Sequence, residues 1–147
     1  MGTPESRPDA IPTTATWLGR AGLLPFIAAP LAMYLLPEQA DLAGRALSVY
    51  ALAIICFLVG VWWGLALIRR QASALVYSNA VVIVAFFGHL GLSTAGFLAL
   101  CALLFPGTIL VERSQALFRP QPAYYARLRL QLTLVATLAL VLSALQL

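Results

Sequence analysis

The sequence predicts an all-α integral membrane protein, with five transmembrane helices in a single bundle. Of its 147 residues, 62% are hydrophobic and only 10% are charged. A soluble domain is about one quarter charged, and a chain of this size has too little interior to hide so much apolar surface from water. The apolar residues also fall into runs that are long enough to cross a bilayer. Lipid is therefore the expected solvent for most of the chain.

The N-terminal segment, residues 1–13, is polar and rich in proline. We expect a flexible tail there, because such a sequence buries too little apolar surface to order itself. A membrane domain is expected over residues 14–147, and its first helix covers about residues 14–36. This helix contains Pro25 and Pro30, which a kinked spanning helix tolerates. A cleaved signal peptide is the alternative, but the run is long and acidic residues precede it.

The remaining apolar residues predict four more helices. A polar loop at residues 37–45 precedes the second helix, about residues 46–68. Residues 72–111 then carry no formal charge over 40 positions, which is about 60 Å of helix and twice the bilayer thickness. This section must turn back, and the glycine, histidine, serine and threonine at residues 88–94 mark the turn. We therefore expect helices at about 72–88 and 92–111, and a last helix at about 124–146.

The arginines predict the orientation of the chain. All nine basic residues are arginine, and with the N-terminus inside only Arg45 falls on the outer side. The other eight fall inside, as the positive-inside rule requires: Arg7, Arg20, Arg69, Arg70, Arg113, Arg119, Arg127 and Arg129. The predicted location is a bacterial inner membrane, multi-pass, with a cytoplasmic N-terminus and a periplasmic C-terminus. The arginines form no single patch with stacking aromatic residues, so no nucleic-acid partner is expected.

The stretch "GVWWGLALIRR" at residues 60–70 predicts a packing face. Gly60 and Gly64 lie four residues apart on one helix face, a spacing that lets another helix approach closely. Trp62 and Trp63 project elsewhere, and Trp63 is close enough to the double arginine to anchor at the membrane interface. The alternative is that both tryptophans line a pocket or face a partner subunit.

Other polar residues have structural or interfacial interpretations. Asn79, in the middle of the third helix, is expected to bond another helix or to join the pocket or partner face. Residues at the inner interface suit lipid headgroups, the aromatic belt or a docking partner: Arg69, Arg70, Tyr124, Tyr125, Arg127 and Arg129. A pairing of Arg20 with Glu112 is also expected.

No constellation in the sequence predicts catalysis. There are no paired carboxylates, phosphate-binding loop or metal-ligand cluster, so we expect no enzyme, no cofactor and no metal. His89 stands alone at the predicted turn, where a solvated or capping role is expected. Cys56 and Cys101 fall inside apolar runs and are expected to pack as small side chains.

Three local patterns resemble a known family. They are "WLGRAGLLPF" at residues 17–26, "FLVGVWWGLAL" at 57–67 and "ARLRLQLT" at 126–133. Together they resemble the small five-helix membrane proteins of domain of unknown function 3429, the transmembrane protein 69-like family. The resemblance covers about residues 15–146. It implies a bacterial inner-membrane or mitochondrial location, and it implies no catalytic residue and no cofactor.

Two functional hypotheses follow. The first is a non-enzymatic accessory or assembly component of a larger membrane complex, for example a respiratory one. Its expected partners are membrane lipids and other membrane protein subunits. The alternative is a protein that binds or carries a small molecule such as a lipid, sterol or tetrapyrrole. An enzyme that acts on lipids is a more distant third.

Overall fold

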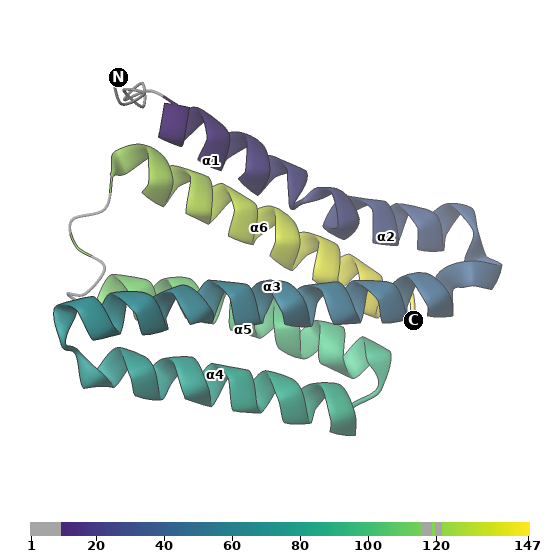
Figure 1. Cartoon of the computed structure of the whole chain (residues 1–147). Coiled ribbons are helices and arrows are strands. Elements are labelled where there is room, and N and C mark those ends of the chain that lie inside the picture. Colours follow the sequence, from purple (N-terminus) through teal and green to yellow (C-terminus); the bar gives the residue numbers. More distant parts are fainter. Residues whose placement is uncertain (1–9, 116–118, 120–121) are drawn as a thin grey trace, which may run out of the picture.

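The computed structural model describes residues 10–115, 119 and 122–147 (Figure 1). Within these residues every regular element is helical. The elements are α1 (Ala10–Ala21), α2 (Leu24–Leu35), the short 3₁₀ helix η1 (Pro37–Gln39), α3 (Ala40–Arg69), α4 (Ala72–Gly91), α5 (Thr94–Ser114) and α6 (Ala123–Leu145).

Five segments of the described chain are long and apolar enough to span a membrane. Helices α1 and α2 together form the first segment, η1 and α3 form the second, and α4, α5 and α6 form one each. Many large apolar side chains point outward from the bundle, as expected where lipid replaces water. The predicted fold class, an all-α integral membrane protein with five spans, is confirmed.

The first span differs from the single kinked helix expected at residues 14–36. Helix α1 already begins at Ala10, within the segment expected to be a tail, and residues 1–9 of that tail lie outside the described residues. The helix then breaks at Gly22 and Leu23. Pro25 accounts for the break, because it has no N–H for the preceding turn and it favours the first turn of a new helix, which is its position in α2.

Two other boundaries also move. The polar loop expected at residues 37–45 is mostly helical, because η1 leads directly into α3. Helix α4 continues past Gly88 to Gly91, and the chain turns at Leu92 and Ser93. Gly88 serves close packing instead of the turn, since a Cβ at this position would collide with Leu100 of α5. Helix α6 lies within one residue of the range expected for it.

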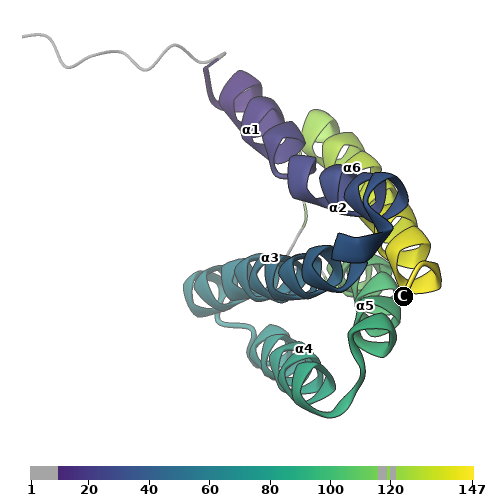
Figure 2. The ribbon, with the colours of Figure 1, turned by 90° about the vertical axis from the view of Figure 1, so that its right-hand side faces the viewer.

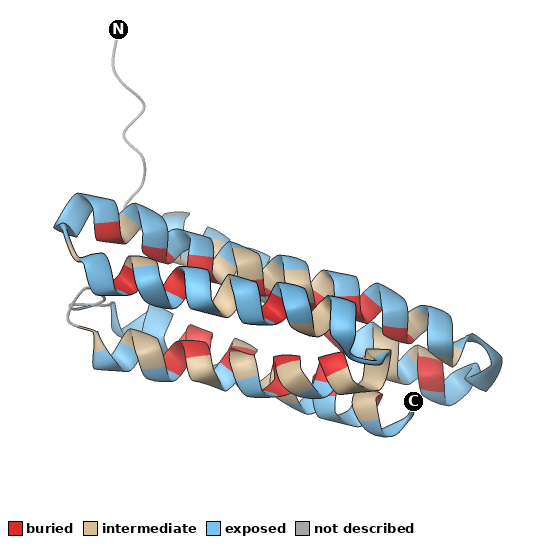
Figure 3. Ribbon diagram, turned by 90° about the horizontal axis from the view of Figure 1, so that it is seen from below, coloured by how far each residue is buried: buried red, intermediate tan, exposed pale blue. Residues whose placement is uncertain are grey.

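The helices pack as one bundle around α3, α5 and α6 (Figure 2). Helix α2 packs against both α3 and α6, whereas α1 packs against α6 and diverges from α3 (Figure 2). The buried residues form stripes on the inward faces (Figure 3). On α3 they recur every three or four positions, as a helix with one packed face requires: Gly44, Leu47, Ser48, Ala51, Ile55, Val59, Trp62 and Ala66.

One end of the bundle gathers the basic residues. Helices α3 and α5 end there, and α1, α4 and α6 begin there (Figure 1). We call it the arginine-rich end, and the described arginines that define it are Arg69, Arg70, Arg113, Arg119, Arg127 and Arg129. Arg45 lies in the first turns of α3, toward the opposite end.

Candidate functional site

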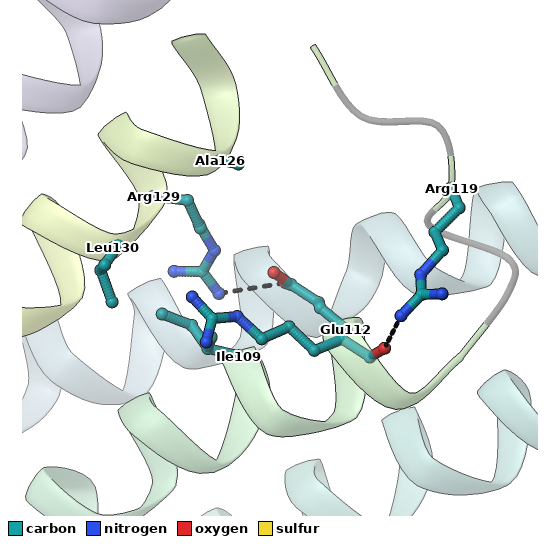
Figure 4. Close-up of a pocket in the computed structure, with 7 residues that line it drawn as sticks. Ile109, Glu112, Arg119, Ala126, Arg129 and Leu130 are labelled. Atoms are coloured by element: carbon teal, nitrogen blue, oxygen red, sulfur yellow. Dashed lines mark hydrogen bonds and ion pairs between the residues drawn. The ribbon is translucent and has the colours of Figure 1, made fainter. Parts of the chain in front are cut away.

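A buried ion pair joins α5 to α6 near the arginine-rich end. The Nη2 atom of Arg129 lies 3.2 Å from Oε1 of Glu112 (Figure 4). The side chains of both residues are largely shielded, with 8% of the Arg129 side chain and 12% of the Glu112 side chain exposed. A charge so shielded within a membrane-spanning segment needs a partner, and such residues often mark functional sites.

Two threonine hydroxyls complete the surroundings of the guanidinium. Arg129 donates to Oγ1 of Thr133 at 3.2 Å and to Oγ1 of Thr108 at 3.0 Å. A guanidinium carries five N–H donors, and these two bonds and the bond to Glu112 are those recorded with the described residues. Arg129 therefore keeps N–H donors for a further acceptor.

The carboxylate of Glu112 also holds Trp62. The indole Nε1 of Trp62 donates to Oε1 of Glu112 at 3.2 Å, and this tryptophan is only 1% exposed. Three helices thus meet at one carboxylate oxygen: α3 through Trp62, α5 through Glu112 itself and α6 through Arg129. Such charge-assisted bonds are stronger than bonds between neutral groups, so this contact fixes the three helices relative to one another.

Two expectations about this region are therefore corrected. Arg129 was predicted to meet lipid headgroups at the interface, but it is 7% exposed and turned into the bundle. Arg20 was predicted to pair with Glu112, but Glu112 pairs with Arg129 and Arg20 is exposed on α1. Arg129 takes the inward position because it shares one face of α6 with Leu128 and Thr133, which are also buried.

A cavity of about 140 Å³ adjoins the ion pair at the arginine-rich end, and we call it the polar cavity because four of its seven lining residues are charged. Its lining consists of Ile109, Glu112, Arg113, Arg119, Ala126, Arg129 and Leu130 (Figure 4). Beside the cavity, Arg69 donates to the carbonyl of Arg119 at 2.7 Å, and Arg119 donates to the carbonyl of Arg113 at 3.1 Å. Arg113 is exposed, and its guanidinium has no recorded hydrogen bond with the described residues.

A larger, apolar groove of about 440 Å³ lies where α1 diverges from α3. Helices α1, α2, α3 and α6 form its walls, with Phe105 of α5 also in contact. The lining is aliphatic and aromatic apart from Tyr125, Arg129 and Thr133. Arg129 lines both the groove and the polar cavity.

Neither the polar cavity nor the apolar groove is the predicted tryptophan pocket. Neither Trp62 nor Trp63 lines the apolar groove. Trp62 is buried and donates to Glu112, whereas Trp63 is 43% exposed on the outer face of α3. An interfacial anchor or a face for a partner subunit stays a prediction for Trp63.

The predicted glycine packing face is also open. A Cβ at Gly60 or Gly64 would meet nothing within 4 Å, so no described helix of this chain approaches them. Close packing of these glycines against another subunit stays a prediction.

Asn79 does not bond another helix. Its side chain is exposed and donates to the carbonyl of Leu75 in the same helix, at 2.8 Å. The adjacent Ser78 makes the inter-helix bond instead, from its buried hydroxyl to the carbonyl of Val59 at 2.8 Å. The expected inter-helix bond is therefore made by the residue before Asn79, because the sequence does not show which face of α4 is inward. A place for Asn79 on a pocket or partner face stays a prediction.

The other predicted interface residues are exposed at the arginine-rich end. These are Arg69, Arg70, Tyr124, Tyr125 and Arg127. Arg70 ends α3 in the left-handed conformation, with φ of 54°. Elsewhere, Cys101 is fully buried and packs as expected, whereas His89 is half-buried and its ring lies 4.8 Å from that of Phe97.

Sequence reasoning missed Thr108 and Thr133 as members of the site. The spacing of these residues could have identified them. Thr108 lies four residues before Glu112, and Thr133 lies four residues after Arg129. Residues at this spacing share a helix face. Two such polar pairs in otherwise apolar helices indicate faces that turn toward each other.

The fold and the site define a multi-pass helical membrane protein with a buried charge pair. The chain belongs to the family described as "Protein of unknown function (DUF3429)", whose match covers residues 11–145. It is also 30% identical over 135 residues to transmembrane protein 69 of Xenopus tropicalis. That match covers 88% of this chain and 53% of the relative, so the chain spans about half the relative's length. No solved structure matches the chain significantly.

Proposed function

We propose that this protein binds a lipid-like amphiphile in the apolar groove and that its role is binding, not catalysis. The groove of about 440 Å³ that ends at a buried arginine carries the proposal. Its volume falls within the range of small-molecule sites, which are mostly apolar with a few polar groups that fix orientation. This is the small-molecule alternative of the sequence analysis, with a different pocket.

The position of the groove supports a ligand that enters from the membrane. Phe57 and Val61 line it from α3 and are themselves exposed on the surface of the bundle. The groove follows α6 from Tyr125 to Ala136, about 16 Å along the helix axis. An extended hydrocarbon chain fits this shape, and its polar end would lie beside Arg129.

A variant that fills the groove tests this function. Val61→Trp adds a bulky ring at the exposed rim, where the fold tolerates it, and Leu67→Trp is the control on the same helix outside the groove. Native mass spectrometry of the gently solubilised protein should show a retained lipid-sized mass. We expect Val61→Trp to lose most of it and Leu67→Trp to keep it.

Either of two results contradicts the proposal. One is a wild-type protein that retains no such ligand in any mild detergent. The other is equal retention by the Val61→Trp and Leu67→Trp variants, which would place the ligand elsewhere on the surface.

A second candidate function is an accessory or assembly component of a larger membrane complex. The observation that favours it is the open face at Gly60 and Gly64, to which another subunit's helix has close access. The double variant Gly60→Leu/Gly64→Leu should abolish co-purification of a partner, while Gly107→Leu, also at an open position, should not. Purification of the wild-type protein without any partner would count against this role.

We also propose a bacterial inner-membrane location with a cytoplasmic N-terminus. The arginine-rich end supports this orientation, because positively charged residues are retained on the cytoplasmic side.

A further inference from the structure

We infer that the polar cavity at the arginine-rich end binds the phosphate group of an anionic phospholipid whose acyl chain occupies the apolar groove. The inference rests on the proposed function and names the class of ligand. Four observations lead to it: the charge of the cavity, the arginine N–H groups without a hydrogen bond to a described residue, the lining residue that it shares with the groove, and its position along the helices.

The cavity has an excess of positive charge. Arg113, Arg119 and Arg129 line it against a single acid, Glu112. Glu112 is already engaged with Arg129 and Trp62. Three guanidinium groups against one carboxylate leave a net charge of +2 that an anion would balance.

The arginines have donors to offer. The Arg113 guanidinium has no recorded hydrogen bond with the described residues, and Arg129 uses only part of its donor set. Arg129 is also rigidly placed, because Thr108, Thr133 and Glu112 hold it within the bundle. A planar guanidinium with fixed orientation suits phosphate oxygens, to which it donates two parallel bonds.

Arg129 lines both the cavity and the groove. A single amphiphile can therefore contact Arg129 with its headgroup while its chain lies along α6. The position of Arg129 along α6 agrees with this arrangement. Arg129 is six residues after the first residue of α6, about 9 Å from the start of the helix. Arg113 lies in the last turn of α5. Headgroup phosphates lie at the level of helix ends, where arginine residues reach them.

The test compares two lipids with the same acyl chains. Phosphatidylglycerol carries a net negative charge at its phosphate, whereas phosphatidylcholine is zwitterionic. Binding of each lipid to the full-length protein in detergent is measured by native mass spectrometry titration. We expect phosphatidylglycerol to bind about tenfold more tightly, because the positive charge of the cavity repels the choline ammonium of phosphatidylcholine.

A pair of arginine variants locates the headgroup. Arg113→Gln removes a cavity charge at an exposed position and should reduce the preference for phosphatidylglycerol severalfold. Arg127→Gln removes the same charge from an exposed position on α6 that does not line the cavity, and it should leave the preference unchanged. Circular dichroism and gel filtration verify that both variants are folded.

Each other outcome overturns the inference in a distinguishable way. Equal affinity for the two lipids, or equal effects of the two variants, removes the proposed site for an anionic headgroup but leaves lipid binding in place. If the wild-type protein binds neither lipid, the proposed function is overturned as well. Tight binding of inorganic phosphate without phosphatidylglycerol binding would make the cavity a site for free phosphate and not for a lipid headgroup.

Discussion

At the scale of single residues, the environment of Glu112 and Arg129 matters most. Removing two charges from water is costly, and their attraction compensates only if the remaining donors and acceptors are also satisfied. Here Trp62, Thr108 and Thr133 supply those contacts. The pair, with Trp62, therefore joins three helices at one carboxylate, and Arg129 also lines both the polar cavity and the apolar groove.

A double-mutant cycle tests this coupling. Arg129→Gln leaves the Glu112 carboxylate shielded without its ion partner, and we expect a cost of about 3 kcal/mol in the free energy of unfolding. Glu112→Gln should cost a similar amount. The double variant should cost clearly less than the sum of the two, because neither charge is then isolated. Unfolding by sodium dodecyl sulfate in mixed micelles measures all three, and strict additivity would show that the two side chains are not coupled.

At the scale of an element, the break in the first span shapes the groove. Pro25 deprives the preceding turn of an N–H, and the chain resumes as α2 in a new direction. The hydroxyl of Tyr50 on α3 donates to the carbonyl of Gly22, at 2.9 Å, and so satisfies a carbonyl at the break. The Tyr50 ring also packs edge-on against Phe26, at 5.3 Å between centroids. Helix α1 can therefore lean away from α3 while α2 stays attached.

Tyr50→Phe isolates the hydroxyl from the ring. The ring contact with Phe26 is kept, but the Gly22 carbonyl loses its donor, so we expect a loss of about 1 kcal/mol in the free energy of unfolding. Tyr77→Phe is the control, since Tyr77 is exposed on α4, and it should stay within about 0.5 kcal/mol of wild type. Unfolding by sodium dodecyl sulfate in mixed micelles measures the stability of both variants. Identical stability of the two variants would mean that the Gly22 carbonyl is satisfied by other means.

At the scale of the whole molecule, five spans place the ends of the membrane domain on opposite sides. Helix α1 begins at the arginine-rich end, and α6 finishes at the other end (Figure 1). The arginine-rich end also contains the polar cavity. In the proposed orientation this end faces the cytoplasm, which would make the cavity accessible to the cytoplasmic leaflet and its anionic lipids.

Reporter fusions test the orientation. Alkaline phosphatase fused after Leu147 should be active in a bacterial host, because this enzyme folds in the oxidising periplasm. Green fluorescent protein fused at the same position should stay dark, and fused before Met1 it should fluoresce. The reverse pattern would show that the arginine-rich end faces outward.

The sequence determined the solvent and the number of spans. Apolar runs of this length have no other stable solution than spanning helices, because unpaired backbone groups are too costly in lipid. The residues of each run were sufficient for this inference, and no contact between runs was needed. The sequence predicted helix ends less accurately. The polar residues 37–45 were expected to form a loop, but polar residues at a membrane surface can also form a helix, as they do here.

Only the tertiary structure decided which face of each helix is inward, and the site depends on that. Arg129 was expected at the lipid interface and Asn79 in an inter-helix bond, yet Arg129 is buried and Asn79 faces outward. Glu112 and Arg129 are 17 positions apart, and Trp62 is 50 positions before Glu112. In lipid, both faces of a spanning helix are apolar, so the hydrophobic periodicity that reveals the inward face of a soluble helix is weak. The groove likewise exists because α1 leans away from α3, a matter of packing between helices that no single run of residues specifies.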